Sequence, residues 1–401
     1  MKSIQLLNNP IQNYAWGSHA AIAELMGRPF PTKAPEAELW MGAHPKAPST
    51  VKTKQGDESL LDLIKRHPLD ILGKETTVAY EKRLPYLFKV LAIEKPLSIQ
   101  VHPNQEQAKQ GFAMENHLGI PVDAAERNYR DDNHKPECIC ALTPFWALNG
   151  FRDKITMIKL LREACADFLG NRILELEEKA DSKGLKHFLD ILLNLEESDV
   201  QKILGRAVRY AEVCKARDPA FDWMIRLHNT YPGDIGVLFP LILNLVCLNP
   251  GQAMHLPAGQ MHAYLEGVGI ELMANSDNVL RGGLTPKHVD VSELLNILDF
   301  KEQPIDIIEP VKRRPCEKVY PTPANEFELS VIETVGREAY TSVKDRGVEI
   351  LLLTSGEVDV FQGNDPGPLR LSRGMSAIVP AAVESYRIIG EGTVYKAGVP
   401  L

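Results

Sequence analysis

The amino-acid sequence predicts a mainly β protein that is interrupted by an inserted block of helices. Short apolar runs separated by proline, glycine and asparagine occupy residues 84–151 and recur from 327 to 401, which is typical of strands and turns. Between residues 154 and 229 this pattern is absent, because no proline occurs before Pro219 and apolar residues recur at helical spacing. The length of 401 residues is enough for two or three domains.

The first β region contains three predicted strands and one predicted helix. Short apolar runs place the strands over residues 87–91, 97–101 and 138–142. A helix is expected over 105–116, because a Pro-Asn pair precedes it and glycine and proline follow it.

The sequence pattern typical of strands returns at Leu238, after the helical block. A short helix is expected over 291–298, and a proline-rich connection follows over 304–323. The strands predicted in the tail cover residues 327–334, 348–353, 358–361, 377–379 and 385–389, with a turn at Ser355-Gly356. Several short strands at such spacing are typical of a sandwich or a barrel.

These elements divide the chain into three expected parts. Residues 1–152 and 238–312 are expected to form one discontinuous β-barrel, and residues 153–237 an inserted helical domain. Residues 313–401 are expected to form a second barrel.

Composition excludes several classes of protein. Lys and Arg number 45 against 53 Asp and Glu, so the net charge of −8 disfavours nucleic-acid and anionic-membrane partners. No apolar run reaches the roughly 18 to 20 residues of a membrane span, and the N-terminus has no apolar core of a secretory signal. Six scattered cysteines are typical of reduced thiols. We therefore expect a cytoplasmic protein.

Two segments of the first β region carry candidate metal ligands. In the alternating run 97–102, Gln100 and His102 share the polar face of a strand and could face a metal. The alternative is that His102 lies at the end of the strand and is hydrated. In the extended segment 129–137, Lys135 and Glu137 share a face, so a carboxylate ligand could lie beside a cation that meets an anionic substrate. An ordinary polar loop is the alternative for this second segment.

A third segment has the spacing G-x5-P-x-G-x2-H, from Gly251 to His262, which is the second metal-binding motif of cupin jelly-roll barrels. The hairpin should turn His262 into the barrel, with Tyr264 facing the same way. Gln100, His102, Glu137 and His262 together offer two nitrogens and two oxygens, which suit Zn²⁺, although Fe²⁺, Mn²⁺ and Co²⁺ remain open. The Gly-x5-Pro spacing recurs at Gly374, with Ser385 in the place of the histidine, so the second barrel should lack metal ligands.

Four stretches of the chain resemble the type I mannose-6-phosphate isomerase (phosphomannose isomerase) family. They are NYAWGS at 13–18, AELWMGAHP at 37–45, YRDDNHKPE at 129–137 and HAYLEGVGIELMANSDNVLRGGLTPK at 262–287. The resemblance implies a cytoplasmic, monomeric, zinc-dependent aldose–ketose isomerase. Its reaction would interconvert D-mannose 6-phosphate and D-fructose 6-phosphate through a cis-enediol(ate).

The resemblance also implies roles for individual residues. Zinc would be held by Gln100, His102, Glu137 and His262. The implied catalytic residues are Arg281, Lys135, His134, Asp277 and Tyr264, and the implied substrate-binding residues are Trp16, Glu38, Lys89 and Glu271. Which of His134, Lys135 and Glu271 moves the C2 proton stays open at the level of sequence. His255 departs from the family pattern and could offer a competing ligand.

Three other possibilities are to be distinguished from an isomerase alone. An Fe²⁺-dependent cupin dioxygenase would normally use a ligand set richer in histidine than one containing Gln100. A non-catalytic sugar-binding cupin would not need Arg281, Lys135 and Asp277 around its metal. A second activity such as nucleotidyl transfer from GTP would need a glycine-rich phosphate loop, which the sequence lacks.

Overall fold

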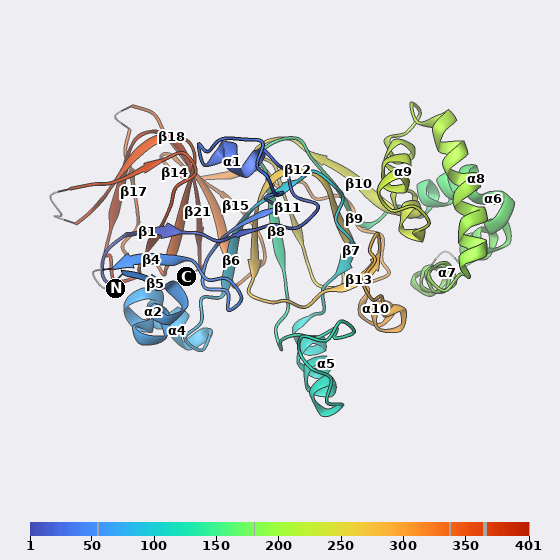
Figure 1. The fold of residues 1–401 in the computed structure, drawn as a ribbon, viewed down its shortest axis with the longest axis horizontal. Helices are drawn as coiled ribbons and strands as arrows, with labels where there is room; N and C mark the ends of the chain where they lie inside the picture. The colour runs from blue at the N-terminus through green and yellow to red at the C-terminus, as the bar shows by residue number, and fades with distance from the viewer. Residues whose placement is uncertain (54–55, 180, 337, 364–366, 401) are drawn as a thin grey trace.

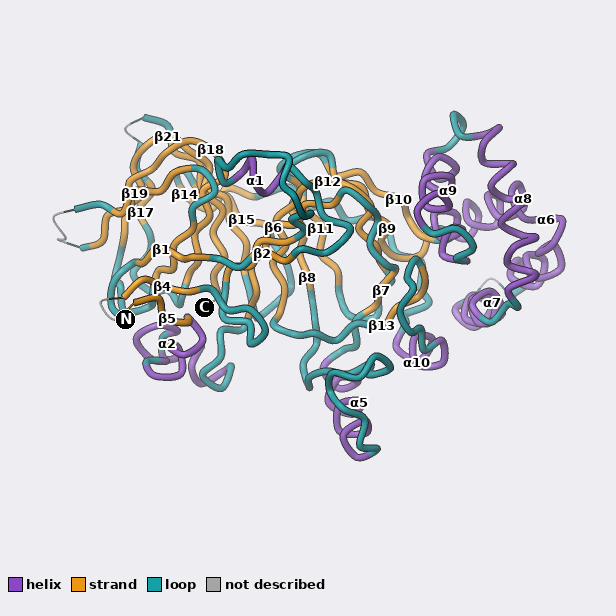
Figure 2. Tube along the Cα trace, in the orientation of Figure 1, coloured by secondary structure: helices purple, strands orange, loops and turns teal. Residues whose placement is uncertain are grey.

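Two large antiparallel sheets form the body of the molecule, and a block of helices covers one end (Figure 1). This computed structural model describes residues 1–53, 56–179, 181–336, 338–363 and 367–400. The helices of this block gather beside β9 (Phe145–Phe151) and β10 (Leu243–Leu248), whereas the strands of the chain's last third lie at the opposite end (Figure 2). Among the helices of the described residues, none is both long and apolar enough to cross a membrane. The prediction of a mainly β fold with a helical insertion is confirmed.

The first sheet is folded into two layers by one long strand. Its strands are β2 (Ile11–Gln12), β3 (Glu38–Met41), β6 (Tyr86–Ile93), β7 (Ile99–Val101), β8 (Glu137–Ala141), β9 (Phe145–Phe151), β10 (Leu243–Leu248), β11 (Ala253–Leu256), β12 (His262–Ala274) and β13 (Leu280–Gly283). The first half of β12 pairs with β7 and β9, and its second half pairs with β6 and β8. Between the halves lies Gly267, at φ +128°, where an added Cβ would stand 2.6 Å from the Pro144 carbonyl oxygen. A side chain would obstruct this bend, so only glycine suits it.

The helical block packs on the outer face of one layer of this sheet. It comprises α6 (Lys154–Glu178), α7 (Ser182–Leu193), α8 (Glu197–Cys214), α9 (Pro219–Thr230) and the 3₁₀ helix η1 (Ile235–Leu241). Ile99 and Val101 of β7 are buried in one apolar cluster with these helices. Gln100 points the other way, into the space between the two layers, as the alternating pattern predicts.

The second sheet contains the strands of the tail and three from the N-terminus. Its strands are β1 (Gln5–Asn8), β4 (Thr50–Thr53), β5 (Gly56–Ser59), β14 (Val311–Arg314), β15 (Glu317–Tyr320), β16 (Glu328–Thr334), β17 (Tyr340–Thr341), β18 (Glu349–Gln362), β19 (Leu369–Ser372), β20 (Ser376–Val379) and β21 (Tyr386–Gly398). Strand β1 pairs with β20, and β4 pairs with β1. Residues near the N-terminus, which local pattern groups with the first barrel, therefore complete the second sheet.

Two local predictions are wrong. Residues 349–362 form one strand, β18, instead of two strands separated by a turn at Ser355-Gly356. A bulge between Leu353 and Ser355, and Gly356 at φ +79°, absorb the irregularity while pairing with β21 continues. No strand begins at Leu238, because residues 235–241 form the 3₁₀ helix η1. Pro240 in this helix has no N–H group to donate to a neighbouring strand.

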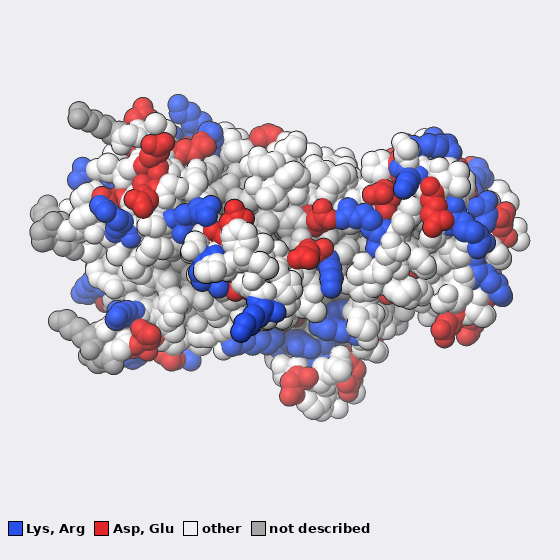
Figure 3. Space-filling model, turned by 45° about the horizontal axis from the view of Figure 1, so that its top comes forward, with Lys and Arg blue, Asp and Glu red and all other residues white. Residues whose placement is uncertain are grey.

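The remaining helices lie on the periphery. They are α1 (Ala21–Leu25), α2 (Leu60–Arg66), α3 (Pro68–Leu72), α4 (Lys74–Ala79), α5 (Gln105–His117) and α10 (Val291–Ile297). Helix α5, predicted over 105–116, begins with a capping box of Asn104 and Gln107 and projects from the body (Figure 1). Lys and Arg side chains gather on the body beside this projection (Figure 3).

The weak sequence repeat corresponds to a repeated piece of backbone. Gly251 (φ +89°) precedes β11, and Gly374 (φ +83°) precedes β20, each two residues before its strand. The strands that follow, β12 and β21, are both 13 residues long. The two sheets are joined by an apolar cluster and by the Tyr86 hydroxyl, which donates to the Ala397 carbonyl oxygen at 3.2 Å.

Candidate active site and metal centre

Three buried side chains converge between the two layers of the first sheet. They are His102, just after β7, Glu137 at the start of β8, and His262 at the start of β12. Their ligand atoms all lie within 4.8 Å of one another, and each residue is at most 2% exposed. The Nε2 atoms of His102 and His262 stand 3.3 and 3.5 Å from the two Glu137 carboxylate oxygens.

The hydrogen bonds of the two imidazoles fit this group to a cation. Nδ1 of His102 lies 2.7 Å from the Asn278 carbonyl oxygen, and Nδ1 of His262 lies 2.9 Å from the Gln260 carbonyl oxygen. Carbonyl oxygens only accept, so each Nδ1 carries the hydrogen and each Nε2 presents a lone pair when the ring is neutral. Burial lowers the pKa of His102 to about 4, so this ring is neutral at pH 7. Nitrogen lone pairs facing a carboxylate repel it unless a metal ion lies between them.

Gln100 and Arg281 lie in one row with His262 across three strands. His262 is directly opposite Gln100 on β7, and Gln100 is directly opposite Arg281 on β13. Directly opposed residues of an antiparallel pair point to the same face, so the three side chains share the face that lines the cavity. Gln100 thereby lies next to the histidines, and Arg281 lies one strand beyond it.

A cavity of about 530 Å³ opens in front of the metal group. It is lined by Tyr14, Trp16, Glu38, Lys89, Gln100, Lys135, Glu137, Tyr231, His262, Tyr264, Glu271, Asp277 and Arg281, among others. Nζ of Lys135 is 2.9 Å from Glu137 Oε1, and the Tyr264 hydroxyl donates to Glu137 Oε2 at 3.4 Å. The structure thus brings twelve of the thirteen predicted site residues to one cavity or its metal group, with His134 as the exception.

A second buried ion pair lines the same cavity. Nζ of Lys89 is 2.9 Å from Glu271 Oε2 and 3.4 Å from Glu38 Oε2. Burial alone would lower the pKa of Lys89, but the two carboxylates raise it above its ordinary value. Burial raises the pKa of the Glu271 carboxyl, against the opposing charge of Lys89. Glu271 is therefore a stronger base than an exposed glutamate.

Three cations at the cavity have no carboxylate within ion-pair distance in the part of the chain that the structure describes. They are Arg130, Arg281 and Lys287. The pKa of Arg281 is lowered by burial and by Arg130, and that of Lys287 by burial and by both arginines. Cations that repel one another without an anionic partner favour the binding of an anion such as a phosphate.

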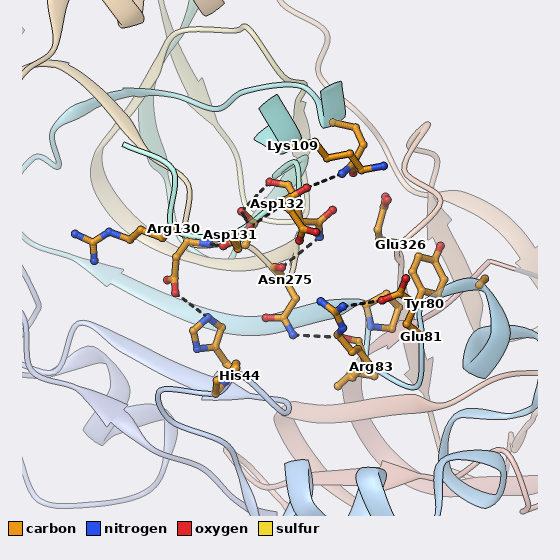
Figure 4. A pocket seen from close by; sticks show the side chains of 18 of the residues that line it. His44, Tyr80, Glu81, Arg83, Lys109, Arg130, Asp131, Asp132, Asn275 and Glu326 are labelled. Atoms are coloured by element: carbon orange, nitrogen blue, oxygen red, sulfur yellow. Dashed lines mark hydrogen bonds and ion pairs between the residues drawn. The ribbon is translucent and has the colours of Figure 1, made fainter. Parts of the chain in front are cut away.

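Sequence reasoning missed the residues that hold Asp277. Its Oδ2 lies 2.9 Å from Lys46 Nζ and 3.5 Å from Nε2 of the buried His44. Lys46, Arg130 and Asp277 also border a second cavity of about 580 Å³, shown with His44 in Figure 4. His44 belongs to the AELWMGAHP motif, so the motif contained a signal, but its partner lies more than 230 residues away in sequence.

Asn278 is another missed residue, and it connects two parts of the site. Its fully buried side chain accepts from the backbone N–H groups of Arg130 at 2.6 Å and Asp131 at 3.2 Å. The side-chain amide also donates to the backbone carbonyl oxygen of Asn133 at 2.9 Å. The backbone carbonyl oxygen of Asn278 accepts from Nδ1 of His102. Asn278 therefore shapes the segment that leads to Glu137.

Two histidines lie away from the metal group. Nε2 of His134 is 2.7 Å from Glu326 Oε1, and His134 is not among the residues that line the active cavity. His255 is paired with Cys138, whereas its neighbour Leu256 is paired with Glu137. Because successive residues of a strand point to opposite faces, His255 faces away from the metal group and cannot compete for its ion.

The two-layer β fold and the buried histidine–glutamate group define a metal-binding enzyme of the cupin type. The family model described as the phosphomannose isomerase type I catalytic domain matches residues 4–154. The chain is 40% identical to mannose-6-phosphate isomerase of Escherichia coli over 392 residues, 97% of this chain and 98% of that protein. It is 41% identical to the Salmonella typhimurium enzyme over the same shares. A zinc-bound crystal structure of mannose 6-phosphate isomerase matches with a TM-score of 0.91 and 39% identity over 100% of both chains. The chain belongs to the type I phosphomannose isomerase family, as its sequence motifs predict.

Proposed function

We propose that this chain is a zinc-dependent isomerase that interconverts D-mannose 6-phosphate and D-fructose 6-phosphate. One Zn²⁺ would be held by Gln100, His102, Glu137 and His262. The observation that carries the proposal is the shared cavity, which combines this buried ligand group with cations that have no carboxylate partner within the described part of the chain. A sugar phosphate needs both features, since its phosphate carries roughly −1.5 to −2 charges at pH 7. The family membership and the zinc-bound relatives support the same reaction.

In this proposal, the cations without a described carboxylate partner determine where the substrate phosphate binds. Arg281 and Lys287, with Arg130 beside them, would bind the phosphate, because no carboxylate of the described residues competes for them. The sugar would then extend along the row from Arg281 towards His262, with Trp16 and Glu38 forming part of the wall. Zinc, when bound, supplies a positive charge that polarises and orients the sugar oxygens.

Glu271 is our candidate for the group that moves the proton between C2 and C1. Its carboxylate faces the cavity, and burial raises its basicity, as a general base requires. Taking the C2 proton gives an enediolate, and returning that proton to C1 completes the isomerisation once a hydroxyl proton has moved from O2 to O1. Lys135 is less suited to act as the base, because its Nζ is engaged in an ion pair with Glu137. That ammonium would stabilise the developing oxyanion.

The remaining predicted residues have supporting roles in this proposal. Asp277, held by Lys46 and His44, would exchange protons with the sugar hydroxyls during ring opening. Tyr264 would orient Glu137 through its hydroxyl. Lys89 would keep Glu271 ionised. His134 would act indirectly, through its contact with Glu326 and the segment that leads to Lys135.

The function is tested by the rate at which the purified protein converts mannose 6-phosphate to fructose 6-phosphate. We expect turnover to be lost after chelation and restored by Zn²⁺. Sugar phosphate binding without turnover would favour a non-catalytic cupin, and oxygen consumption with Fe²⁺ would favour a dioxygenase. Turnover that persists after complete removal of metal would contradict the zinc assignment.

Replacing Arg281 by alanine is expected to lower kcat/KM by about 10² to 10³-fold, because the substrate loses a partly buried cation. Competitive inhibition by inorganic phosphate should weaken in parallel. Arg281→Lys should recover part of the loss, since lysine keeps the charge but not the two-pronged guanidinium. The control is Arg313→Ala, which removes an exposed ion pair with Glu328 in the second sheet and should leave kcat/KM unchanged. Unaltered phosphate inhibition in Arg281→Ala would exclude this residue from the phosphate site.

We further propose that the chain acts as a cytoplasmic monomer, with the division into 1–152 plus 238–312, 153–237 and 313–401. The metal group and the cations that the reaction needs are all supplied by this chain. The cysteines are all free, which suits a reducing compartment. Strands β1, β4 and β5 would be shared with the third part. Light scattering on the purified protein tests the monomer, and a mass of two chains would contradict it.

A further inference from the structure

A carboxylate at the end of the helical block holds the loop that follows β13. Asp234 precedes η1, and its Oδ1 accepts a hydrogen bond from the backbone N–H of Gly236 at 2.7 Å. Its Oδ2 accepts from the backbone N–H of Thr285 at 3.1 Å. One side chain therefore connects the inserted helices to the segment 283–287.

The segment held by Asp234 has a strained backbone and leaves little free space. Leu284 is 1% exposed and has φ +53°, a left-handed conformation that is rare for a branched, bulky residue. A Cβ on Gly283 would stand 3.1 Å from Asp234 Oδ1, and one on Gly236 would stand 2.9 Å from the Leu284 nitrogen. Such a conformation persists only where its surroundings hold it, and here the two chain segments approach too closely for other side chains.

The same segment forms one wall of the active cavity. Leu284, Thr285, Pro286 and Lys287 all line it. The Thr285 hydroxyl accepts from the backbone N–H of Lys287 at 3.1 Å, so hydrogen bonds run from Asp234 through Thr285 to Lys287. Lys287 has no carboxylate partner among the residues described, so no ion pair fixes it, and its placement depends on this backbone.

We propose that Asp234 is a positioning residue for the substrate phosphate. It holds the segment 283–287 so that Lys287 stays beside Arg281 at the phosphate end of the cavity. The inserted domain 153–237, which contains none of the site residues predicted from sequence, thereby contributes to substrate affinity. This inference rests on the proposed function, because it assigns the phosphate of that substrate to these cations.

The decisive variant is Asp234→Asn. The amide oxygen can still accept from Gly236, but the amide NH₂ cannot accept from Thr285 and would oppose its N–H group. The matched control is Asp218→Asn. Asp218 precedes α9 in the same helical block and accepts from the N–H of Ala220 at 2.8 Å, but it makes no bond to the segment 283–287.

For Asp234→Asn we expect KM for mannose 6-phosphate and Kd for inorganic phosphate to rise by roughly tenfold, the effect of one lost hydrogen bond to a charged group. We expect kcat to stay within about twofold of the parent value, since no group at the reacting carbons changes. The Tm of the variant should match that of Asp218→Asn, whose KM should be unchanged.

Unchanged KM and phosphate affinity in Asp234→Asn would overturn the inference. So would a fall in Tm larger than that of the control together with a fall in kcat, because a merely structural role predicts both. The parent protein separates this failure from failure of the proposed function. If the parent binds phosphate but does not isomerise mannose 6-phosphate, the function is refuted, while the phosphate affinities of the variants still decide the role of Asp234.

Discussion

Replacing His262 by alanine is expected to release zinc and to reduce isomerisation by at least about a thousandfold, since a bound metal contributes several kcal/mol to the stabilisation of developing charge. His262 supplies one of the two imidazole nitrogens in the buried group, and its loss leaves Glu137 with His102, Lys135 and Tyr264 as its neighbours. Metal content by mass spectrometry and the conversion rate of mannose 6-phosphate measure the two effects separately. Added zinc should not restore the rate at concentrations that saturate the parent protein.

The matched control for His262→Ala is His255→Ala. His255 lies on the neighbouring strand β11, is partly buried, and faces away from the metal group. Its Nε2 is buried and has no hydrogen-bond partner among the residues that the structure describes, so its removal breaks none of the described bonds at that atom. We expect this variant to retain one zinc per chain and full turnover. Stoichiometric zinc in His262→Ala would contradict the proposed ligand set, and loss of zinc in His255→Ala would contradict the orientation of β11.

Local sequence pattern was sufficient wherever one short segment determines the geometry. The alternation in residues 97–102 placed Gln100 between the layers because the period of a strand fixes which side chains share a face. The spacing from Gly251 to Pro257 predicted a turn, and Gly251 has the positive φ that such a turn requires. The helical block was equally readable, since its apolar residues recur at helical spacing and form one core.

The pairing of strands that are distant in sequence could not be predicted from the local sequence pattern. Gln5 pairs with Ile378, so the first strand completes a sheet built mostly from the last third of the chain. Neither segment carries a signal that identifies its partner, since both are strands of only four residues. The same limit applies to the continuity of β18, because a glycine bulge and a glycine turn have the same composition.

The missed residues of the site share this origin. His44 and Lys46 hold Asp277, Asn278 holds the segment before Glu137, and Asp234 holds the segment before Lys287. Each of these residues acts through a contact across the fold, and the motifs that contain His44 and Asn278 do not identify the residue each one contacts. A sequence motif identifies the groups that do the chemistry, and the tertiary structure identifies the groups that keep them in place.

Glu271→Gln is expected to lower kcat by about 10² to 10⁴-fold, the usual contribution of a positioned general base, with KM changed much less. The amide has the shape of the carboxylate and can still accept from Lys89, but it cannot take the C2 proton. Zinc content should be unchanged, because Glu271 is not a member of the metal group. The rate is measured with mannose 6-phosphate carrying deuterium at C2, whose isotope effect should increase as proton removal becomes rate-limiting.

Glu38→Gln distinguishes a base from a member of the Lys89 ion pair. Glu38 lies 3.4 Å from the same Lys89 nitrogen, lines the same cavity and receives a hydrogen bond from Trp40 Nε1. If Glu271 acts only by balancing the charge of Lys89, the two variants should lose similar activity, since each removes one negative charge from the same ammonium. If Glu271 takes the proton, Glu38→Gln should lose at least tenfold less in kcat, because only one of the two carboxylates serves as base. Equal losses would transfer the role of base to Lys135, the remaining candidate that lines the cavity.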